Sequence, residues 1–194
     1  MTKLWSTTRA KQAIAAIMAV AFTVGGVLTV NTASGQMPAA VALAIDNVTR
    51  PWEGRELKAY RDAVGVPTIC DGDTQNVKMG MVETQAGCDA RLRRRMLTEF
   101  YPALQACITG FDGKPISWQA MMIDLSWNIG HGGTCKSTAA RLGREGKYLE
   151  SCYAATKFNR AGGKVLIGLV KRREMGDATR IGEGELCVSG LEGV

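Results

Sequence analysis

The sequence predicts an α+β fold in which a small β lobe is joined to a larger helical lobe, with a cleft between the two. Residues 65–84 are rich in Gly, Thr, Val and Asp, which favours short strands and turns. Beyond residue 84, apolar residues recur at helical intervals. Residues 13–30 form an uncharged apolar run of 18 residues, which predicts an additional N-terminal membrane helix.

The apolar run has the layout of an export signal, because Lys3, Arg9 and Lys11 precede it. Three interpretations remain open: a signal peptide cleaved near residues 32–34, a permanent transmembrane anchor, or a weak anchor that later leaves the membrane. The run is rich in Ala, Gly and Thr and contains a single Leu, so its insertion into lipid is only weakly favourable. Composition therefore favours the weak, releasable anchor.

The predicted organisation is a short appendage followed by one domain. Residues 1–34 are expected to be the signal anchor, residues 35–46 a linker or an entering helix, and residues 47–194 the catalytic domain. The domain is long enough to bury a sizeable hydrophobic core.

The first part of the domain is predicted to form a helix and a small sheet. Residues 49–60 are expected to be helical, with Thr49 as a cap and Pro51 in the first turn. Short strands are expected at residues 68–70 and 76–78, separated by turns.

The rest of the domain is predicted to be helical. Thr84 is the expected N-cap of a helix that reaches Leu104, and Ser117 is the expected cap of a helix over residues 118–129. The apolar residues of that second helix are expected to be core: Met121, Met122, Leu125 and Ile129. Three further helices are expected at residues 137–144, 147–157 and 164–178.

The net charge of +6 is concentrated in two runs, residues 91–95 and residues 171–173. Such runs are usually solvated helix faces, although a basic surface also suits a polyanion such as a bacterial wall. Few aromatic residues interleave with the charges, so no nucleic-acid partner is expected.

Six cysteines, all located beyond the apolar run, predict structural disulfides in an exported domain. Six cysteines allow 15 pairings, and the sequence does not choose among them. No Cys-x-x-Cys motif occurs and His131 is the single histidine, so neither a metal nor another cofactor is expected. His131 itself, placed among glycines, is expected to be a loop residue or a helix cap. Zinc amidases and peptidases are also disfavoured, because they usually need two or more histidine ligands and this chain has one histidine.

Two acidic residues and a threonine follow one another at short spacing. Glu53 precedes Asp62 by nine positions, and Thr68 follows six positions later. Hydrolysis of a glycosidic bond requires one carboxyl group that donates a proton and a second carboxylate on the other side of the bond. Glu53 and Asp62, separated by a bend in the chain, are candidates for these two roles.

The pattern Glu-Gly-x-x-Leu-x-Ala-Tyr-x-Asp-x-x-Gly-x-x-Thr-Ile over residues 53–69 resembles the catalytic segment of phage-type lysozymes, the muramidases of glycoside hydrolase family 24. The resemblance runs from about residue 47 to residue 187 and includes residues 126–130 and 158–173. It implies a lysozyme-like fold that cuts the β-1,4 bond between N-acetylmuramic acid and N-acetylglucosamine.

By the same resemblance, Glu53 is the general acid, whereas Asp62 and Thr68 position the attacking water. The N-terminal segment is similar to that of signal-arrest-release endolysins of phages. This implies an enzyme tethered to the host inner membrane through residues 13–30 and then released into the periplasm to cause lysis. A monomer is expected, with peptidoglycan as substrate.

The sequence departs from the family after the Thr-Ile pair. Many relatives continue with Gly-His-Thr, whereas here Asp73 takes the histidine's place and Asp71 adds a further acid. Extra carboxylates near Glu53 are expected to raise its pKa, which suits an acid that must stay protonated.

Two alternatives to a muramidase are a lytic transglycosylase, which cuts the same bond and leaves an anhydro product, and a non-catalytic cationic protein that binds the wall or disrupts membranes. The Asp62 and Thr68 pair disfavours the first, since an intramolecular attack needs no positioned water. The second does not require the acid pair at all.

Overall fold

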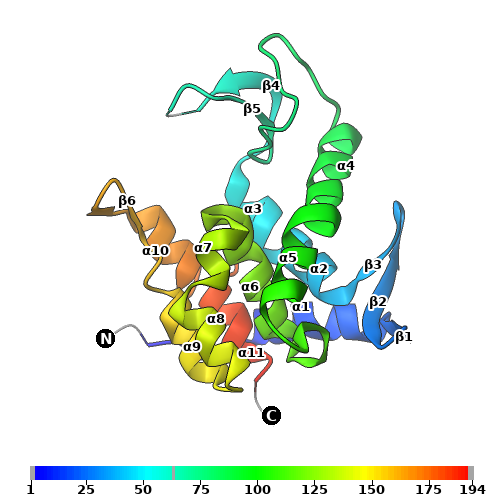
Figure 1. Ribbon diagram of the computed structural model, residues 1–194, viewed down its shortest axis with the longest axis vertical. Helices are drawn as coiled ribbons and strands as arrows, with labels where there is room; N and C mark the ends of the chain where they lie inside the picture. Colours follow the sequence, from blue (N-terminus) through cyan, green and yellow to red (C-terminus); the bar gives the residue numbers. More distant parts are fainter. Residues whose placement is uncertain (1–2, 63, 192–194) are drawn as a thin grey trace.

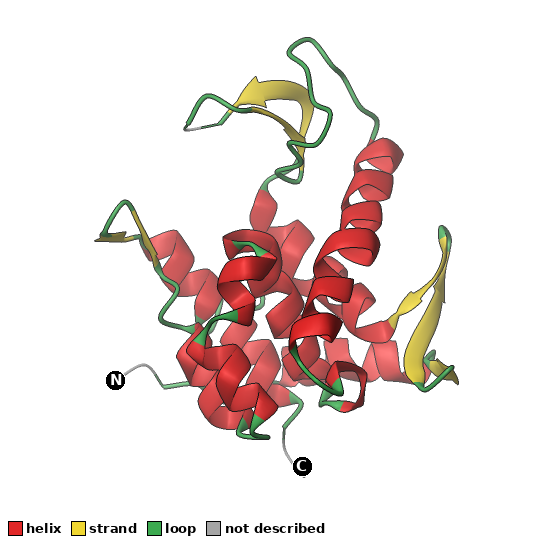
Figure 2. Cartoon of the chain, viewed as in Figure 1, coloured by secondary structure: helices red, strands yellow, loops and turns green. Residues whose placement is uncertain are grey.

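The computed structural model describes residues 3–62 and 64–191. Helices gather in one lobe around a central helix, and a small β lobe projects above them (Figures 1 and 2). The predicted α+β, two-lobed arrangement is therefore confirmed.

The N-terminal apolar run does not form a single helix. Helix α1 (Thr8–Ala19) ends within the run, and an antiparallel sheet of β1 (Phe22–Val24), β2 (Val27–Thr32) and β3 (Gly35–Pro38) follows. Gly25 and Gly26, at φ of 55° and 82°, make the two-residue turn between β1 and β2, a backbone conformation that favours glycine. Among the helices described here, none is long and apolar enough to cross a bilayer.

Residues 35–46, expected to be a linker or an entering helix, begin with β3 and then enter a helix. A continuous helical stretch runs through α2 (Ala39–Ala44), the π-helical turn η1 (Ile45–Thr49) and α3 (Arg50–Glu53). Every residue of α2 is buried, because its apolar side chains pack against the central helix. Thr49 therefore lies inside this helical stretch rather than capping its start.

The predicted helix over residues 49–60 stops early. Gly54 adopts the left-handed conformation, with φ of 62°, and ends α3. The chain then forms β4 (Glu56–Arg61), which pairs antiparallel with β5 (Pro67–Cys70). Leu57 and Ala59 pack towards a small second core in the β lobe. Their alternate spacing, in which every second residue faces this core, is that of a strand and not of a helix. Residues 76–78 form no strand.

A long helical stretch connects the β lobe to the helical lobe. It consists of α4 (Gln85–Arg95), the π-helical turn η2 (Met96–Phe100) and α5 (Tyr101–Cys107), with the short 3-10 helix η3 (Phe111–Gly113) after it. The expected N-cap is confirmed, because the Thr84 hydroxyl accepts a hydrogen bond from Gly87 N at 2.9 Å.

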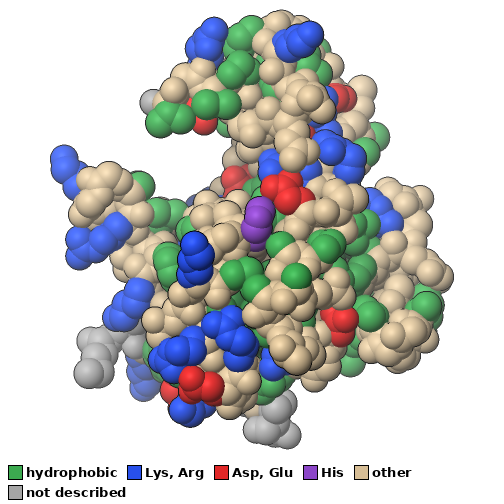
Figure 3. All heavy atoms as spheres, viewed as in Figure 1, with side chains coloured by type: hydrophobic (Ala, Val, Ile, Leu, Met, Phe, Trp, Pro, Cys, Tyr) green, Lys and Arg blue, Asp and Glu red, His purple; other side chains and the backbone are tan. Residues whose placement is uncertain are grey.

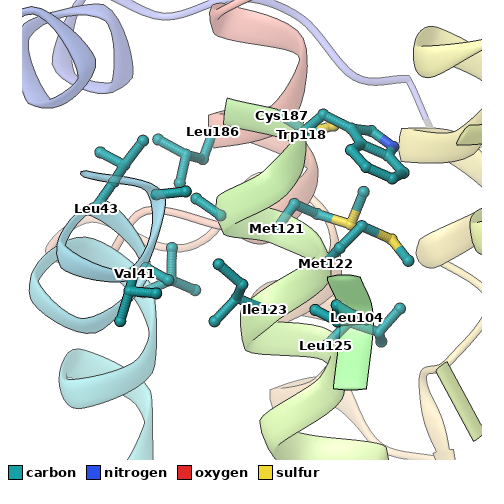
Figure 4. Close-up of a cluster of buried hydrophobic side chains, with 14 of the residues drawn as sticks. Val41, Leu43, Leu104, Trp118, Met121, Met122, Ile123, Leu125, Leu186 and Cys187 are labelled. Carbon is teal, nitrogen blue, oxygen red and sulfur yellow. The ribbon is translucent and has the colours of Figure 1, made fainter. Parts of the chain in front are cut away.

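The central helix is α6 (Ile116–Ile129). It begins two residues earlier than expected, with Pro115 at the N-cap position, and the Ser117 hydroxyl instead donates to Cys187 O at 2.9 Å. The side chains of α6 contribute much of the core, as Figure 4 shows for Met121, Met122, Ile123 and Leu125.

Short helices complete the lobe: α7 (His131–Cys135), α8 (Thr138–Arg144), α9 (Tyr148–Ala155), α10 (Ile167–Arg173) and α11 (Glu183–Ser189). The expected helices over residues 137–144 and 147–157 are confirmed. The helix expected over residues 164–178 is shorter, because β6 (Arg160–Ala161) and β7 (Lys164–Val165) form a hairpin before it.

All six cysteines are paired, which confirms the predicted disulfides. Cys70–Cys88 joins β5 to α4, and so ties the β lobe to the connecting helix. Cys107–Cys135 joins α5 to α7, and Cys152–Cys187 joins α9 to α11.

These bridges predict that reduction destabilises the folded protein. Cys152 and Cys187 are fully buried, and replacing both with alanine should lower the free energy of unfolding by about 2–4 kcal/mol. Thermal unfolding of the double variant and of the native protein, with and without reductant, measures the effect. Six alkylatable thiols in the native exported protein would contradict the pairing.

Candidate active site

Glu53, the last residue of α3, lies at the junction of the two lobes. Its side chain is 16 % exposed, and its Oε1 atom lies 2.7 Å from Arg172 Nη1. Its Oε2 atom faces Gly72, and a Cβ atom added at Gly72 would lie 3.5 Å from this oxygen. The turn after β5 therefore closes over the carboxyl group of Glu53.

A cavity of about 410 Å³ opens beside Glu53. Its lining combines residues of both lobes: Glu53, Gly72, Arg95, Glu99, Phe100, Trp127, Asn128, Gly130, His131 and Gly132. In Figure 3 the purple histidine lies at the hollow beneath the β lobe. A mixed wall of aromatic rings, charges and amide groups suits a polar ligand such as a sugar chain.

The aromatic side chains of this wall pack against one another and against Arg95. The rings of Phe100 and Trp127 lie 5.1 Å apart, and the guanidinium of Arg95 stacks 5.2 Å from each centroid. His131, expected to be a loop residue or cap, is the first residue of α7, and its ring approaches Phe100 edge-on at 6.2 Å.

The pKa of Glu53 is raised above its ordinary value, and burial is the main cause. The charge of Arg172 lowers the pKa but does not outweigh burial, while the charges of Asp124 and Asp71 raise it. A carboxyl group in this environment retains its proton to a higher pH than an exposed glutamate, as a general acid requires.

Asp62 lies in the turn after β4. Its Oδ1 atom accepts hydrogen bonds from Val64 N at 3.0 Å and from Val66 N at 2.8 Å, which fixes the orientation of the carboxylate. Thr68 is buried in β5, and its hydroxyl donates to Val66 O at 3.0 Å. Neither residue lines the cavity beside Glu53.

Tyr60 connects the three candidates. It is the register partner of Thr68 in the sheet. The pKa of its phenol is raised by burial and then by the negative charges of Glu53, Glu56 and Asp62. Both candidate acids thus lie within electrostatic reach of one phenol, although only Glu53 reaches the cavity.

The sequence did not predict the buried partners of Glu53. Residues 171–173 were expected to form a solvated face, yet Arg172 is 4 % exposed and Arg173 is fully buried. Arg172 is held by Asp124 of α6, and Arg173 by Glu183 of α11. The sequence held one indication of this burial. Asp124 is the single acid within the apolar stretch of α6, and a buried carboxylate requires a cationic partner.

The two unusual acids after the Thr-Ile pair are both buried, and each has arginine partners. Asp71 accepts two hydrogen bonds from Arg55, at 2.7 and 3.0 Å. Asp73 forms ion pairs with Arg91 at 3.0 Å and Arg95 at 3.3 Å. The expected rise in the pKa of Glu53 therefore comes in small part from Asp71, whereas Asp73 instead fastens the β lobe to α4.

A protonatable, buried glutamate in a cleft between a β lobe and a helical lobe defines a lysozyme-like glycoside hydrolase. A sequence model described as Phage lysozyme matches residues 50–176. The chain belongs to the phage lysozyme family, and it is a peptidoglycan-hydrolysing enzyme.

Individual relatives agree with this assignment. The chain is 30 % identical to the SAR-endolysin of Enterobacteria phage P21, over 79 % of this chain and 90 % of that protein. It is 33 % identical to the SAR-endolysin of Pseudomonas phage phiKMV, over 70 % of this chain and 84 % of that protein.

Solved structures show the same fold. An endolysin from Escherichia coli O157:H7 phage FAHEc1 superposes with a TM-score of 0.63 and 26 % identity, covering 78 % of this chain and 92 % of that chain. The active form of P1 phage endolysin Lyz has a TM-score of 0.64 at 19 % identity. It covers 96 % of this chain and 97 % of that chain, so the similarity in fold extends into the N-terminal region.

The raised pKa of Glu53 predicts a pH-dependent stability difference. Between the unfolded-state pKa of about 4.3 and the raised folded-state pKa, the folded protein binds more protons than the unfolded one, so its stability falls as pH rises. Glu53→Gln removes this loss of stability, because glutamine does not titrate. The melting temperature of the variant minus that of the native protein should therefore increase as pH rises through this window and stay constant above it.

Thermal unfolding at a series of pH values measures the difference. Glu56→Gln is the matched control, because Glu56 is an exposed residue of β4. A pH-independent difference for Glu53→Gln would contradict the prediction.

Proposed function

We propose that this enzyme is an endolysin that hydrolyses the β-1,4 bond between N-acetylmuramic acid and N-acetylglucosamine, with Glu53 as the general acid. The observation that carries the proposal is the burial of Glu53 beside a polar cavity at the lobe junction, where burial raises its pKa. From there it donates its proton to the leaving glycosidic oxygen.

Asp62 and Thr68 hold the attacking water on the opposite face of the sugar ring. The fixed carboxylate of Asp62, held by two backbone amides, supports this role, as does the pairing of Thr68 with Tyr60. Attack by a water molecule inverts the anomeric configuration. It requires the two carboxyl groups to be roughly 6.5–9.5 Å apart.

Loss of the transferable proton is the first test. Glu53→Gln preserves the shape of the side chain, so the lysis of purified cell walls should fall about 10²–10⁴-fold while folding is retained. Turbidity measures the rate and circular dichroism measures the fold. Asp62→Ala should also be severe, whereas Glu56→Gln should be mild. Native-like lysis by Glu53→Gln would refute the assignment of the acid.

The products distinguish the alternatives. Mass spectrometry of digested peptidoglycan should find reducing ends, because water is the nucleophile. Anhydro ends would instead identify a lytic transglycosylase, and wall binding without any cleavage would identify a non-catalytic cationic protein.

We also propose that residues 13–30 hold the enzyme at the host inner membrane before release into the periplasm. The weakly apolar run and its basic flank support this, and so does the similarity to two proteins named SAR-endolysins. The folded state offers the same segment a second location, since α1 packs against α2 and α11.

Polar contacts fasten the segment to this second location. Arg9 reaches both carboxylate oxygens of the buried Glu185 at 2.7 Å, and the Thr7 hydroxyl donates to the same carboxylate at 2.6 Å. These contacts can form only once the apolar run has left the lipid. On release, the segment loses a weakly favourable insertion free energy. In return it gains packing against the folded protein and the partly buried ion pair between Arg9 and Glu185.

Substitution of the β1–β2 turn tests this exchange. Gly25→Leu with Gly26→Leu favours insertion by on the order of 1 kcal/mol per position. It also strains a turn that requires positive φ, so release on depolarisation should slow. Fractionation of cells before and after depolarisation measures the released enzyme.

Gly162→Leu with Gly163→Leu is the matched control. These glycines make the β6–β7 turn at φ of 55° and 77°, outside the apolar run, so release should remain native. Native enzyme that arrives in the periplasm already shortened near residue 34 would show instead that the segment is a cleaved signal peptide.

A further inference from the structure

Glu53 belongs to a cluster of charged groups that is largely sealed from solvent. Asp124 Oδ1 and Oδ2 accept hydrogen bonds from Arg172 Nη2 at 2.9 Å and Nε at 3.1 Å. Arg172 Nη1 lies 2.7 Å from Glu53, and Glu183 Oε1 lies 3.5 Å from Arg172 Nε. Arg173 in turn donates to Glu183. Four helices thus supply one cluster: α3, α6, α10 and α11.

The charges in this cluster do not balance. Three carboxyl groups (Glu53, Asp124 and Glu183) face two guanidinium groups (Arg172 and Arg173), so full ionisation would leave a net charge of −1. An uncompensated charge away from water is costly, and such a site takes up a proton instead. One bound proton makes the cluster neutral.

Glu53 has the fewest ionic contacts of the three acids. Asp124 is fully buried and accepts two hydrogen bonds from one guanidinium, and Glu183 contacts both arginines. Glu53 is approached by a single nitrogen of Arg172, through one of its two oxygens. Of the three acids, Glu53 is therefore the one whose ionic contacts least oppose a bound proton, and it also borders the cavity.

We propose that Asp124 is a positioning residue that neutralises Arg172, so that Arg172 can hold the Glu53 carboxyl group in the cleft without removing its proton. The inference rests on the proposed role of Glu53 as the general acid. An arginine alone beside Glu53 would favour the carboxylate, which cannot donate a proton. The bidentate contact with Asp124 offsets that attraction.

The other charged groups around Glu53 do not substitute for Asp124. Asp71, in the turn after β5, is bound by Arg55. Arg95 and Glu99, which line the cavity, pair with each other at 2.9 Å. Of the residues that the structure describes, Tyr60 of β4 and His131 of α7 also face this region. Among the described residues, Asp124 is the acid with two hydrogen bonds to the arginine that touches Glu53.

The test is a titration of Glu53 by carbon-13 NMR of its side-chain carboxyl, assigned by the loss of the signal in Glu53→Gln. In Asp124→Asn, the pKa of Glu53 should fall by on the order of one unit. The alkaline limb of the kcat/KM profile on cell walls should move to lower pH by the same amount. Asp112→Asn is the control, because Asp112 bonds Tyr101 and Gln105 away from this cluster, and both readouts should stay native.

The double variant Asp124→Asn with Arg172→Gln separates electrostatics from structural damage. It removes the cation together with its neutralising partner, so Glu53 should titrate at or above its native pKa, even though activity is reduced. Because both partners of the buried ion pair become neutral amides, neither is left as an uncompensated charge inside the protein. The double variant can therefore be measured even where Asp124→Asn fails to fold.

Two outcomes overturn the inference: an unmoved Glu53 titration in folded Asp124→Asn, or a Glu53 pKa in the double variant well below native. The NMR readout needs no catalysis. A failed inference is thereby distinguished from a failed catalytic assignment, which Glu53→Gln tests by lysis.

Discussion

The buried guanidinium of Arg172 is the interaction on which the cleft depends. It contacts carboxyl groups from α3, α6 and α11, so it fixes three helices relative to one another and holds Glu53 at the lobe junction. Its own pKa is raised despite burial, because its interactions with the Asp124 and Glu53 carboxyl groups outweigh the loss of solvation. A group that stays charged away from water requires partners on several sides, and those partners determine how the helical lobe closes.

The β lobe is fastened to this helical frame by different chemistry. The Cys70–Cys88 bridge joins β5 to α4, and Asp73 forms ion pairs with Arg91 and Arg95 on the same helix. Because the segment that carries Asp62 and Thr68 is small and has only a minor core, these covalent and ionic links replace the packing that a larger lobe would have. The geometry between Glu53 and Asp62 thus depends on the integrity of α4.

The N-terminal segment combines features that suit the folded protein with features that suit the membrane location proposed for it. Its apolar, weakly hydrophobic composition suits a brief stay in lipid, while its glycine turn and Arg9 suit a folded hairpin and an ion pair with Glu185. The apolar side chains that composition assigns to a membrane, such as Val30, are buried in the folded protein's core. The hydrophobic effect favours burial in either place, so the membrane location proposed for the segment would compete with its packing in the folded protein.

The sequence by itself determined the α+β class, the motif around Glu53 that resembles the family, the presence of disulfides and the Thr84 cap, because each follows from local pattern or composition. Only the tertiary structure decided that residues 56–61 are a strand, since their partner β5 and the small β-lobe core lie elsewhere in the chain. It also decided that Arg172 and Arg173 are buried. Charge runs are usually solvated, and the carboxylates that neutralise this one come from positions as distant as Glu53 and Asp124. Long-range pairing, which no local pattern encodes, therefore set the environment of Glu53, the proposed catalytic acid.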